Sequence, residues 1–479
     1  MIRTDPPLFP FQRSDISLFV EDLRVKRMTF CTWEQGLGKS RAVITVTDAM
    51  KFRMVLVICP AIARISWPIQ VGEWGSPGDR HYIVDGVRAA RKLRQQRSNG
   101  VLYVIVSSDG CRNDEVRHWL HQAPFDFAVI DEAQYLRNPE AKRTTALYHR
   151  GTGAIMRIPD IMLMTGTPIV SWPLDMWTHL KRFAPHRILN AWGQVMSFEE
   201  FKHEFHVLKW RRLPHAREPS LRIINSKSER DLQIRLDGFM HRRLKEEVLP
   251  DLPPFHVQRW PIACTVHERE GMLDALNREM PPDIVRMLRE ARTGEDMALV
   301  VDAINKDIGS TSKLIRILGM AKASAVGRML AEELSENHYK IGILALNHDV
   351  MNMIYARLQA FNPVLITGRT KGAQDAISVR RFQTDPSCRV VVGQIQAIGT
   401  AIELTAASRL IGLQLLWLPG ENGQAFARFH RIGQRDAVTC RVPYFPGTID
   451  EAQMSVLIRR TSAALSVIDP YSRKASLPH

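Results

Sequence analysis

The sequence lacks the features of a membrane-spanning, exported or disulfide-stabilised protein. No run approaches the roughly 18 consecutive apolar residues that a membrane-spanning helix needs, and no apolar signal region follows the N-terminus. Its six cysteines are scattered and none forms a C-x-x-C pair, which disfavours zinc ribbons and disulfide frameworks. These absences favour a globular protein of a reducing compartment, so we expect it in the cytoplasm.

Acidic residues are outnumbered: 50 Asp and Glu stand against 65 Lys and Arg, which gives a net charge of +15. Such an excess attracts polyanions and predicts a nucleic-acid partner, although a basic enzyme without one has the same composition. Two segments concentrate the cations, residues 88–97 and 209–222. The first spaces them like a solvated helix face, whereas the second interleaves Trp210 with cations, as a nucleic-acid-binding insertion does.

Internal repeats and low-complexity tails are also missing, and short apolar runs bounded by turn residues recur instead. The runs are Val55–Cys59, Val101–Val106, Phe127–Ile130, Ile161–Met164, Ile341–Leu346, Val364–Thr367, Val390–Gly393 and Leu410–Leu413. Because polar, helix-prone stretches separate them, they predict an α/β fold with a parallel sheet in each half. Residues 186–310 are charged and helix-rich. We therefore expect two lobes, residues 1–185 and 311–479, joined by a mostly helical insertion.

The most informative segment is a glycine-containing loop, Trp33-Glu34-Gln35-Gly36-Leu37-Gly38-Lys39-Ser40. In a phosphate-binding loop, backbone N–H groups wrap the polyphosphate and glycines let the backbone approach it. Lys39 would then neutralise the β- and γ-phosphates, and the Ser40 hydroxyl would complete the Mg²⁺ shell. The usual spacing asks for glycine at position 33, where this chain has Trp33, and small Gly-Lys-Ser turns also occur by chance.

A second element supports the nucleotide interpretation. The run Asp126–Ile130 ends in Asp131 and Glu132, which predicts a buried strand that delivers two carboxylates to its C-terminal edge, where ligands of open α/β sheets bind. Asp131 would hold Mg²⁺ and Glu132 would polarise the attacking water. The alternative is a solvated acidic turn. Because the pair lies downstream of the glycine loop, it predicts an ATP-hydrolysing enzyme.

The order of these motifs resembles that of superfamily-two helicases, and specifically that of the Swi/Snf-type DNA translocases. The most specific segment, which resembles the family's sixth motif, is Gln424-Ala425-Phe426-Ala427-Arg428-Phe429-His430-Arg431-Ile432-Gly433-Gln434. The resemblance implies two RecA-like lobes and assigns Arg428 and Arg431 as arginine fingers, which stabilise the charge that develops on the γ-phosphate in the transition state. An arginine-rich helix that grips surface carboxylates is the alternative.

Further segments follow the family's order. Gln12 resembles its adenine-reading glutamine, so with Gly36 and Gly38 of the loop it is expected to bind the nucleotide. Residues 239–248 and 251–254 resemble the stretch that enters the family's second lobe. The positions at which the resemblance implies DNA contact, or coupling of DNA to nucleotide state, are Pro60, Ser107, Thr165, Thr167, Gly368 and Thr405.

The chain departs from the family pattern at several positions. Gln134 stands where the family has histidine; glutamine can hydrogen-bond but cannot titrate, so the departure concerns coupling between lobes rather than hydrolysis. Ala401 and Glu403 stand where glycine and a neutral polar residue are common. Because a carboxylate close to a phosphate is unfavourable, we expect Glu403 to face away. We assign Trp67, in the segment that resembles motif Ia, to core packing.

The resemblance implies a DNA-dependent ATPase that uses ATP and Mg²⁺ to translocate along or remodel double-stranded DNA. The chain shows no reader domain or zinc module, so we expect a compact bacterial or phage-like member, or a nuclear protein if the source is eukaryotic. Two alternatives stay open. One is an RNA-directed or polymerase-recycling ATPase, and the other is a DNA-binding clamp built on a motor that no longer hydrolyses ATP.

Overall fold

The computed structural model describes residues 7–170, 172–211, 220–291, 296, 300–301, 303–304, 308–367, 372–398, 403–416, 419–452 and 454–455. Within these ranges the chain forms two compact units. The first comprises the described residues up to Val207 together with Asn225–Pro250, and the second comprises the described part of 208–224 and of the chain from Asp251 onward. The domain limits expected at residues 185 and 310 stay predictions, because compactness alone does not define a functional domain.

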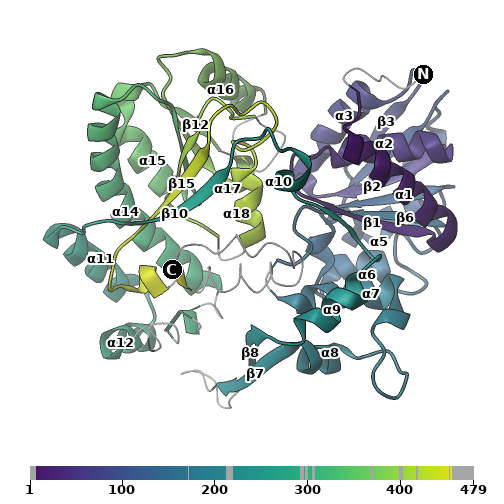
Figure 1. The fold of residues 1–479 in the computed structure, drawn as a ribbon, viewed down its shortest axis with the longest axis horizontal. Helices are drawn as coiled ribbons and strands as arrows, with labels where there is room; N and C mark the ends of the chain where they lie inside the picture. The colour runs from purple at the N-terminus through teal and green to yellow at the C-terminus, as the bar shows by residue number, and fades with distance from the viewer. Residues whose placement is uncertain are drawn as a thin grey trace. The chain divides into compact units, whose positions relative to one another are not determined.

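The first unit is built on a seven-stranded sheet in which neighbouring strands are parallel (Figure 1). In their order across the sheet the strands are β3 (Arg80–Val84), β4 (Leu102–Ser107), β2 (Met54–Cys59), β5 (Phe127–Asp131), β6 (Asp160–Met164), β1 (Met28–Trp33) and β9 (His241–Arg243). The central strands are apolar and buried along nearly their whole length, as expected where helices cover both faces of a sheet. Their carboxyl ends meet at one edge.

The helices of the first unit are α1 (Pro10–Lys26), α2 (Lys39–Met50), α3 (Ser66–Trp74), α4 (Val87–Arg91), α5 (Asp114–His121), α6 (Lys142–Tyr148), α7 (Trp177–Phe183), α8 (Phe198–Phe205), α9 (Glu229–Leu236) and α10 (Lys245–Val248). Most of these helices lie between the strands in the chain, whereas α1 precedes β1 and α10 follows β9. α1 packs against α2 and β1 (Figure 1). Phe19 and Leu23 lie on one face of α1, four residues apart, and both are fully buried. This packing fixes the N-terminal helix beside the loop that follows β1.

The edge strand β9 comes from far along the chain and completes the first sheet beside β1. His241 Nε2 lies 2.7 Å from Asp22 Oδ2, and Arg243 donates two hydrogen bonds to the fully buried Asp15 carboxylate. Burial alone would raise the pKa of Asp22, but hydrogen bonds from His241 and Lys26 lower it below its usual value. Polar side-chain contacts therefore add to the backbone pairing that holds this strand beside β1.

The second unit contains a six-stranded parallel sheet. Its strands, in order across the sheet, are β10 (Phe255–Pro261), β15 (Val438–Tyr444), β14 (Arg409–Gly412), β11 (Ile341–Ala345), β13 (Val390–Gln394) and β12 (Val364–Ile366). Its helices are α11 (Val266–Glu279), α12 (Pro282–Glu290), α14 (Ile308–Glu336), α15 (His348–Arg357), α16 (Gly372–Thr384), α17 (Ile395–Ile398) and α18 (Pro419–Phe426).

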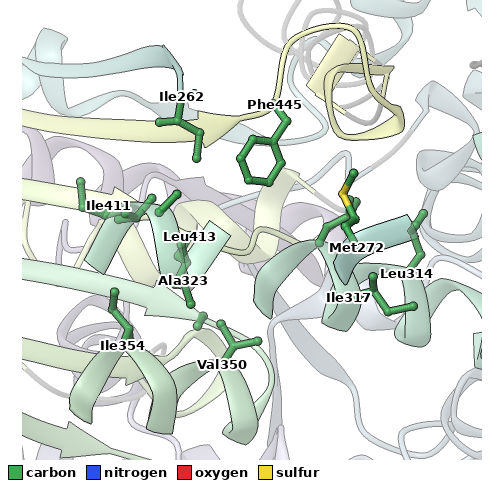
Figure 2. Close-up of a cluster of buried hydrophobic side chains, with 14 of the residues drawn as sticks. Ile262, Met272, Leu314, Ile317, Ala323, Val350, Ile354, Ile411, Leu413 and Phe445 are labelled. Atoms are coloured by element: carbon green, nitrogen blue, oxygen red, sulfur yellow. The ribbon is translucent and has the colours of Figure 1, made fainter. Parts of the chain in front are cut away.

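One of the hydrophobic cores of the second unit lies where α14 packs against α11 and α15, and another includes Leu344 and Val391. Figure 2 shows side chains of these helices and of β14 gathered in one apolar cluster, among them Ile317, Ile354 and Ile411. An ion pair, Lys322 with Asp450 at 2.8 Å, is buried at its margin. This core is separate from the one beneath β1 and β2 in the first unit, so each sheet has its own hydrophobic support.

The predicted α/β class with two parallel sheets is confirmed, and every apolar run identified in the sequence overlaps a strand. A further two-stranded sheet, β7 (His206–Arg211) and β8 (Ser220–Ser226), carries the exposed Trp210, which is 69% accessible. The apolar runs leave out β1, β3, β9, β10 and β15 of the two large sheets, and β9 and β10 are rich in polar residues. In the part of the chain that the structure describes, no helix is both long and apolar enough to cross a membrane.

Candidate functional site

The loop that joins β1 to α2 has a left-handed backbone that glycine adopts most easily. Gly36 and Gly38 have φ angles of 86° and 84°. A Cβ added to Gly38 would lie 2.6 Å from Gln12 Nε2, so a side chain there would also displace Gln12. Lys39 and Ser40 follow as the first residues of α2, where free N–H groups and the helix dipole favour an anion. The loop thus joins two left-handed glycines to a helix N-terminus, an arrangement that favours an anion.

Trp33 ends β1, and its side chain belongs to the core rather than to the loop. It is fully buried, and its ring packs against Phe11 and Phe19 at centroid distances of 5.2 and 5.6 Å. Its indole N–H donates to Asp15 Oδ2 at 2.8 Å. The absence of glycine at position 33 is therefore accommodated, because the left-handed residues of the loop come later.

Gln12 supports the loop directly. Its side chain is 4% exposed. Its Oε1 accepts from the Phe9 N–H at 3.0 Å, and its Nε2 donates to the Leu37 carbonyl at 2.8 Å. The amide therefore links the start of α1 to the loop, and its chemistry leaves one further hydrogen and one lone pair for another partner.

Lys39 folds back over the loop. Its Nζ donates to the Trp33 carbonyl at 2.9 Å and to the Glu34 carbonyl at 3.4 Å. Burial lowers the pKa of Lys39, and the nearby negative charges of Glu132 and Asp131 oppose that change. The structure thus brings together the lysine of the loop and the two carboxylates at the end of β5.

Asp131 is the last residue of β5, between β2 and β6. Its Oδ2 accepts a hydrogen bond from Trp67 Nε1 at 3.0 Å. Burial raises the pKa of Asp131 to about 7, the charge of Glu132 adds to the rise, and Trp67 and Lys39 oppose it. Trp67, which we had assigned to packing alone, is therefore also a polar partner of this carboxylate.

Glu132 has a left-handed backbone with φ of 52°, a conformation that costs a non-glycine residue roughly 1–2 kcal/mol. Such strain is concentrated at functional sites. The buried Gln134 donates from Nε2 to Glu132 Oε2 at 2.9 Å. Within the described part of the chain, Gln134 Oε1 is buried without a hydrogen-bond partner. Glutamine thus holds the Glu132 carboxylate with a donor that does not titrate.

The turn after β6 packs against the glycine loop. Thr165 is fully buried, and its Oγ1 accepts from the Thr167 N–H at 2.9 Å. A Cβ added to Gly166 would lie 2.5 Å from Gln35 Cγ, so this loop side chain rests directly on the turn. Arg242 Nη1 donates to the Gly166 carbonyl at 3.0 Å and to a backbone carbonyl of β1 at 2.6 Å. The turn is therefore connected to both the loop and β1.

Pro60 and Ser107 lie at the carboxyl ends of the neighbouring strands β2 and β4. The Pro60 carbonyl accepts from the Ala63 N–H at 2.9 Å and starts a short 3₁₀ turn. Ser107 is 6% exposed, and its Oγ accepts from the Gly110 N–H at 2.9 Å. Both residues shape turns at the sheet edge that also carries Asp131.

Arg428 and Arg431 lie in the turns that follow α18 in the second unit. Arg431 Nη2 lies 3.1 Å from Glu403 Oε1, and the Glu403 side chain is 60% exposed. The Arg428 carbonyl accepts from the Leu404 N–H at 3.0 Å. The arginine segment and the segment that begins at Glu403 are therefore joined by both backbone and side-chain contacts.

Gln434 strengthens that junction. Its Nε2 lies within hydrogen-bond distance of the carbonyls of Thr405, Ala407 and Phe429, at 3.1 to 3.2 Å. The Thr405 hydroxyl accepts from Gln383 Nε2 at 3.2 Å. Gly368 and Ala401, which the sequence analysis also singled out, lie outside the described residues.

The segment that contains β9 has contacts with the loop that sequence analysis missed. The Glu34 N–H donates to the Arg243 carbonyl at 2.9 Å, and the Lys245 N–H donates to Glu34 Oε2 at 2.8 Å. The Lys245 side chain is 4% exposed, and its Nζ lies 3.8 Å from Glu34 Oε1. This segment looked diagnostic of a family rather than functional. The high density of cationic residues in this short strand could have indicated its contacts, because a buried cation needs a partner.

Comparisons with known proteins give one family. A family model described as the SNF2-related domain matches residues 25–284, more than half of the chain. The chain is 24% identical, over 98% of its length, to the DNA annealing helicase and endonuclease ZRANB3 of Homo sapiens. It is 27% identical, over 94% of its length, to the SWI/SNF-related matrix-associated actin-dependent regulator of chromatin subfamily A-like protein 1 of Drosophila melanogaster.

The chain spans 41% and 54% of the length of these two curated relatives. Among solved structures it is similar to the Sulfolobus solfataricus SWI2/SNF2 ATPase core in complex with dsDNA, with 20% identity, a TM-score of 0.42, and 96% and 97% of the two chains covered. The match of the family model over more than half of the sequence confirms the predicted family: this protein belongs to the SNF2-related family.

Proposed function

We propose that this protein is a DNA-dependent ATPase that uses ATP hydrolysis to translocate along or remodel double-stranded DNA. The observation that carries the proposal is the cluster of Lys39, Asp131 and Glu132 beside a left-handed glycine loop. Membership of the SNF2-related family supports nucleotide use, and the names of its relatives, which include a DNA annealing helicase, support DNA as the partner. The net charge of +15 suits a polyanion.

In this proposal the first unit binds ATP and cleaves its γ-phosphate. Lys39 neutralises the β- and γ-phosphates, and the loop N–H groups wrap them. Glu132 orients and polarises the attacking water while Gln134 holds its carboxylate. Gln12 reads the adenine edge with the hydrogen and lone pair that its contacts with the chain leave available.

Ser40 and Asp131 are the proposed protein ligands of Mg²⁺, which supplies positive charge to the phosphates. A hydroxyl and a carboxylate are the oxygen donors that this ion prefers, and it usually keeps several waters and substrate phosphates as its other ligands. The described residues contain no cluster of three or more His, Cys, Asp or Glu side chains suited to a metal. Two protein donors, the Ser40 hydroxyl and the Asp131 carboxylate, suit an ion that binds together with its nucleotide.

Arg428 and Arg431 are proposed to stabilise the charge on the γ-phosphate in the transition state. Glu403 engages Arg431 Nη2, so in this proposal the carboxylate competes with the phosphate for that guanidinium. The positions proposed to contact the DNA backbone, or to link it to nucleotide state, are Pro60, Ser107, Thr165, Thr167, Gly368 and Thr405. Full burial of Thr165 favours a linking role for that residue.

The test is ATP turnover by the purified chain at fixed salt with no polymer, duplex DNA, single-stranded DNA or RNA. Glu132→Gln is the inactive variant, and Glu115→Gln, which changes an exposed carboxylate of the same unit, is its matched control. We expect duplex DNA to stimulate wild type and the control but not Glu132→Gln. Stimulation by RNA alone would instead indicate an RNA-directed ATPase. Tight DNA binding without turnover would indicate a clamp.

A further inference from the structure

We propose that Trp67 is a positioning residue that orients the Asp131 carboxylate for Mg²⁺. This inference rests on the proposed function, since it assumes that Asp131 is a metal ligand. The sequence context of Trp67 indicated only packing. The proposal assigns a function to one group of this side chain, the indole N–H.

The sheet places the two residues together. β2 and β5 are neighbours, with Ile58 level with Ile130, so the chain that leaves β2 passes the end of β5. It turns through residues 61–64 and enters α3, where Trp67 is the second residue. Trp67 is 1% exposed, and its Nε1 lies 3.0 Å from Asp131 Oδ2. The contact joins residues 64 positions apart in sequence.

The chemistry of the contact suits a metal ligand. A tryptophan N–H is a donor only, and a buried one needs an acceptor. The donor holds Oδ2 and restricts rotation of the carboxylate, so Oδ1 points over a narrower range of directions. Because indole is neutral, it orients the carboxylate without cancelling the negative charge that Mg²⁺ requires. A lysine or arginine at this position would orient the group but compete with the ion. Outer partners of this kind tune metal affinity by on the order of 10- to 100-fold.

The test replaces the indole N–H and keeps an aromatic ring. Trp67→Phe is compared with Trp177→Phe, which removes another buried indole N–H in the same unit, one that donates to the Met196 carbonyl at 3.0 Å. Two quantities are measured: the Mg²⁺ concentration that half-activates ATP turnover, and the affinity for a fluorescent ATP analogue with saturating Mg²⁺ and with EDTA. Thermal unfolding without Mg²⁺ reports on folding alone.

We expect Trp67→Phe to raise the half-activating Mg²⁺ concentration by on the order of 10- to 100-fold and to reduce the gain in analogue affinity that Mg²⁺ provides. Its affinity in EDTA should match that of wild type, and Trp177→Phe should match wild type in the Mg²⁺ dependence and in both analogue affinities. An unchanged Mg²⁺ dependence in a folded Trp67→Phe variant would overturn the proposal. If wild type hydrolyses no ATP, the proposed function fails, but the analogue measurement still tests the role of Trp67.

A second measurement covers the case in which Trp67→Phe does not fold. The wild-type protein is labelled with ¹⁵N at its tryptophan indoles, and its spectrum is compared with that of Asp131→Asn. One indole N–H signal should move in the variant, and the same signal should move when Mg²⁺ and a non-hydrolysable ATP analogue are added to wild type. If Asp131→Asn moves no indole signal, the hydrogen bond is absent and the proposal is wrong.

Discussion

Replacing Arg243 by methionine should destabilise the first unit strongly, because it leaves the Asp15 carboxylate buried without its cation. Asp15 is fully buried and receives two hydrogen bonds from Arg243 and one from Trp33. Breaking a buried pair by removing one partner costs about 3–5 kcal/mol. The Arg243 side chain is 37% exposed, so water replaces part of the loss and we expect the lower end, about 3 kcal/mol. For a unit of this size, that corresponds to a fall in melting temperature of about 6–12 °C.

Differential scanning calorimetry measures this shift, with Arg91→Met as the control. Arg91 pairs with Glu115 at the surface of the same unit, so its loss should cost no more than about 1 kcal/mol. The double variant Asp15→Asn with Arg243→Met should recover much of the stability, because no charge remains buried. If Arg243→Met behaves like Arg91→Met, or if the double variant loses the sum of the two single changes, the reasoning is wrong.

Three further predictions concern single side chains. Glu403→Gln should raise kcat/KM for ATP about two- to fivefold, since an ion pair this exposed is worth about 0.5–1 kcal/mol and competes with the phosphate for Arg431. The gain should vanish in an Arg431→Ala background. Gln134→Leu should lower kcat on the order of tenfold at unchanged nucleotide affinity, because the Glu132 carboxylate loses its hydrogen-bond donor. An unaltered kcat in steady-state kinetics would contradict this prediction. Asp22→Asn should destabilise the first unit at pH 7. The difference in the free energy of unfolding from wild type, measured by circular dichroism, should shrink below about pH 4. The reason is that a carboxyl group with a lowered pKa contributes stability only while it is ionised.

Local patterns predicted the α/β class and eight of the thirteen strands in the two large sheets. The apolar runs became strands because a strand covered on both faces must be apolar along its whole length. The position of Asp131 and Glu132 followed from the same pattern, since a polar pair directly after such a run has to lie at the sheet edge. The glycine loop could be recognised in spite of Trp33, because Gly36, Gly38 and Lys39 keep their spacing relative to the helix that follows.

The remaining features depend on contacts between residues far apart in the chain. A buried tryptophan looks the same in a sequence whether its N–H meets a backbone carbonyl or a carboxylate, so the contact of Trp67 with Asp131 was not predictable. The strand β9 has only three residues, all of them polar, and it is a strand because β1 offers it an unpaired edge. The pairing of Glu403 with Arg431 likewise required the turn that brings the two segments together.

The late arrival of β9 has a consequence for synthesis of the protein. The Thr32 hydroxyl donates to the His241 carbonyl, a contact that spans 209 residues. On a ribosome that adds about 5–20 residues per second, the edge of β1 that pairs with β9 therefore stays unpaired for about 10–40 s. During that time its edge presents unpaired backbone groups and a hydrophobic face, which is a template for aggregation. We expect the nascent chain to depend on chaperones in this interval. We also expect fragments that end before β9 to aggregate, even though they contain the whole glycine loop.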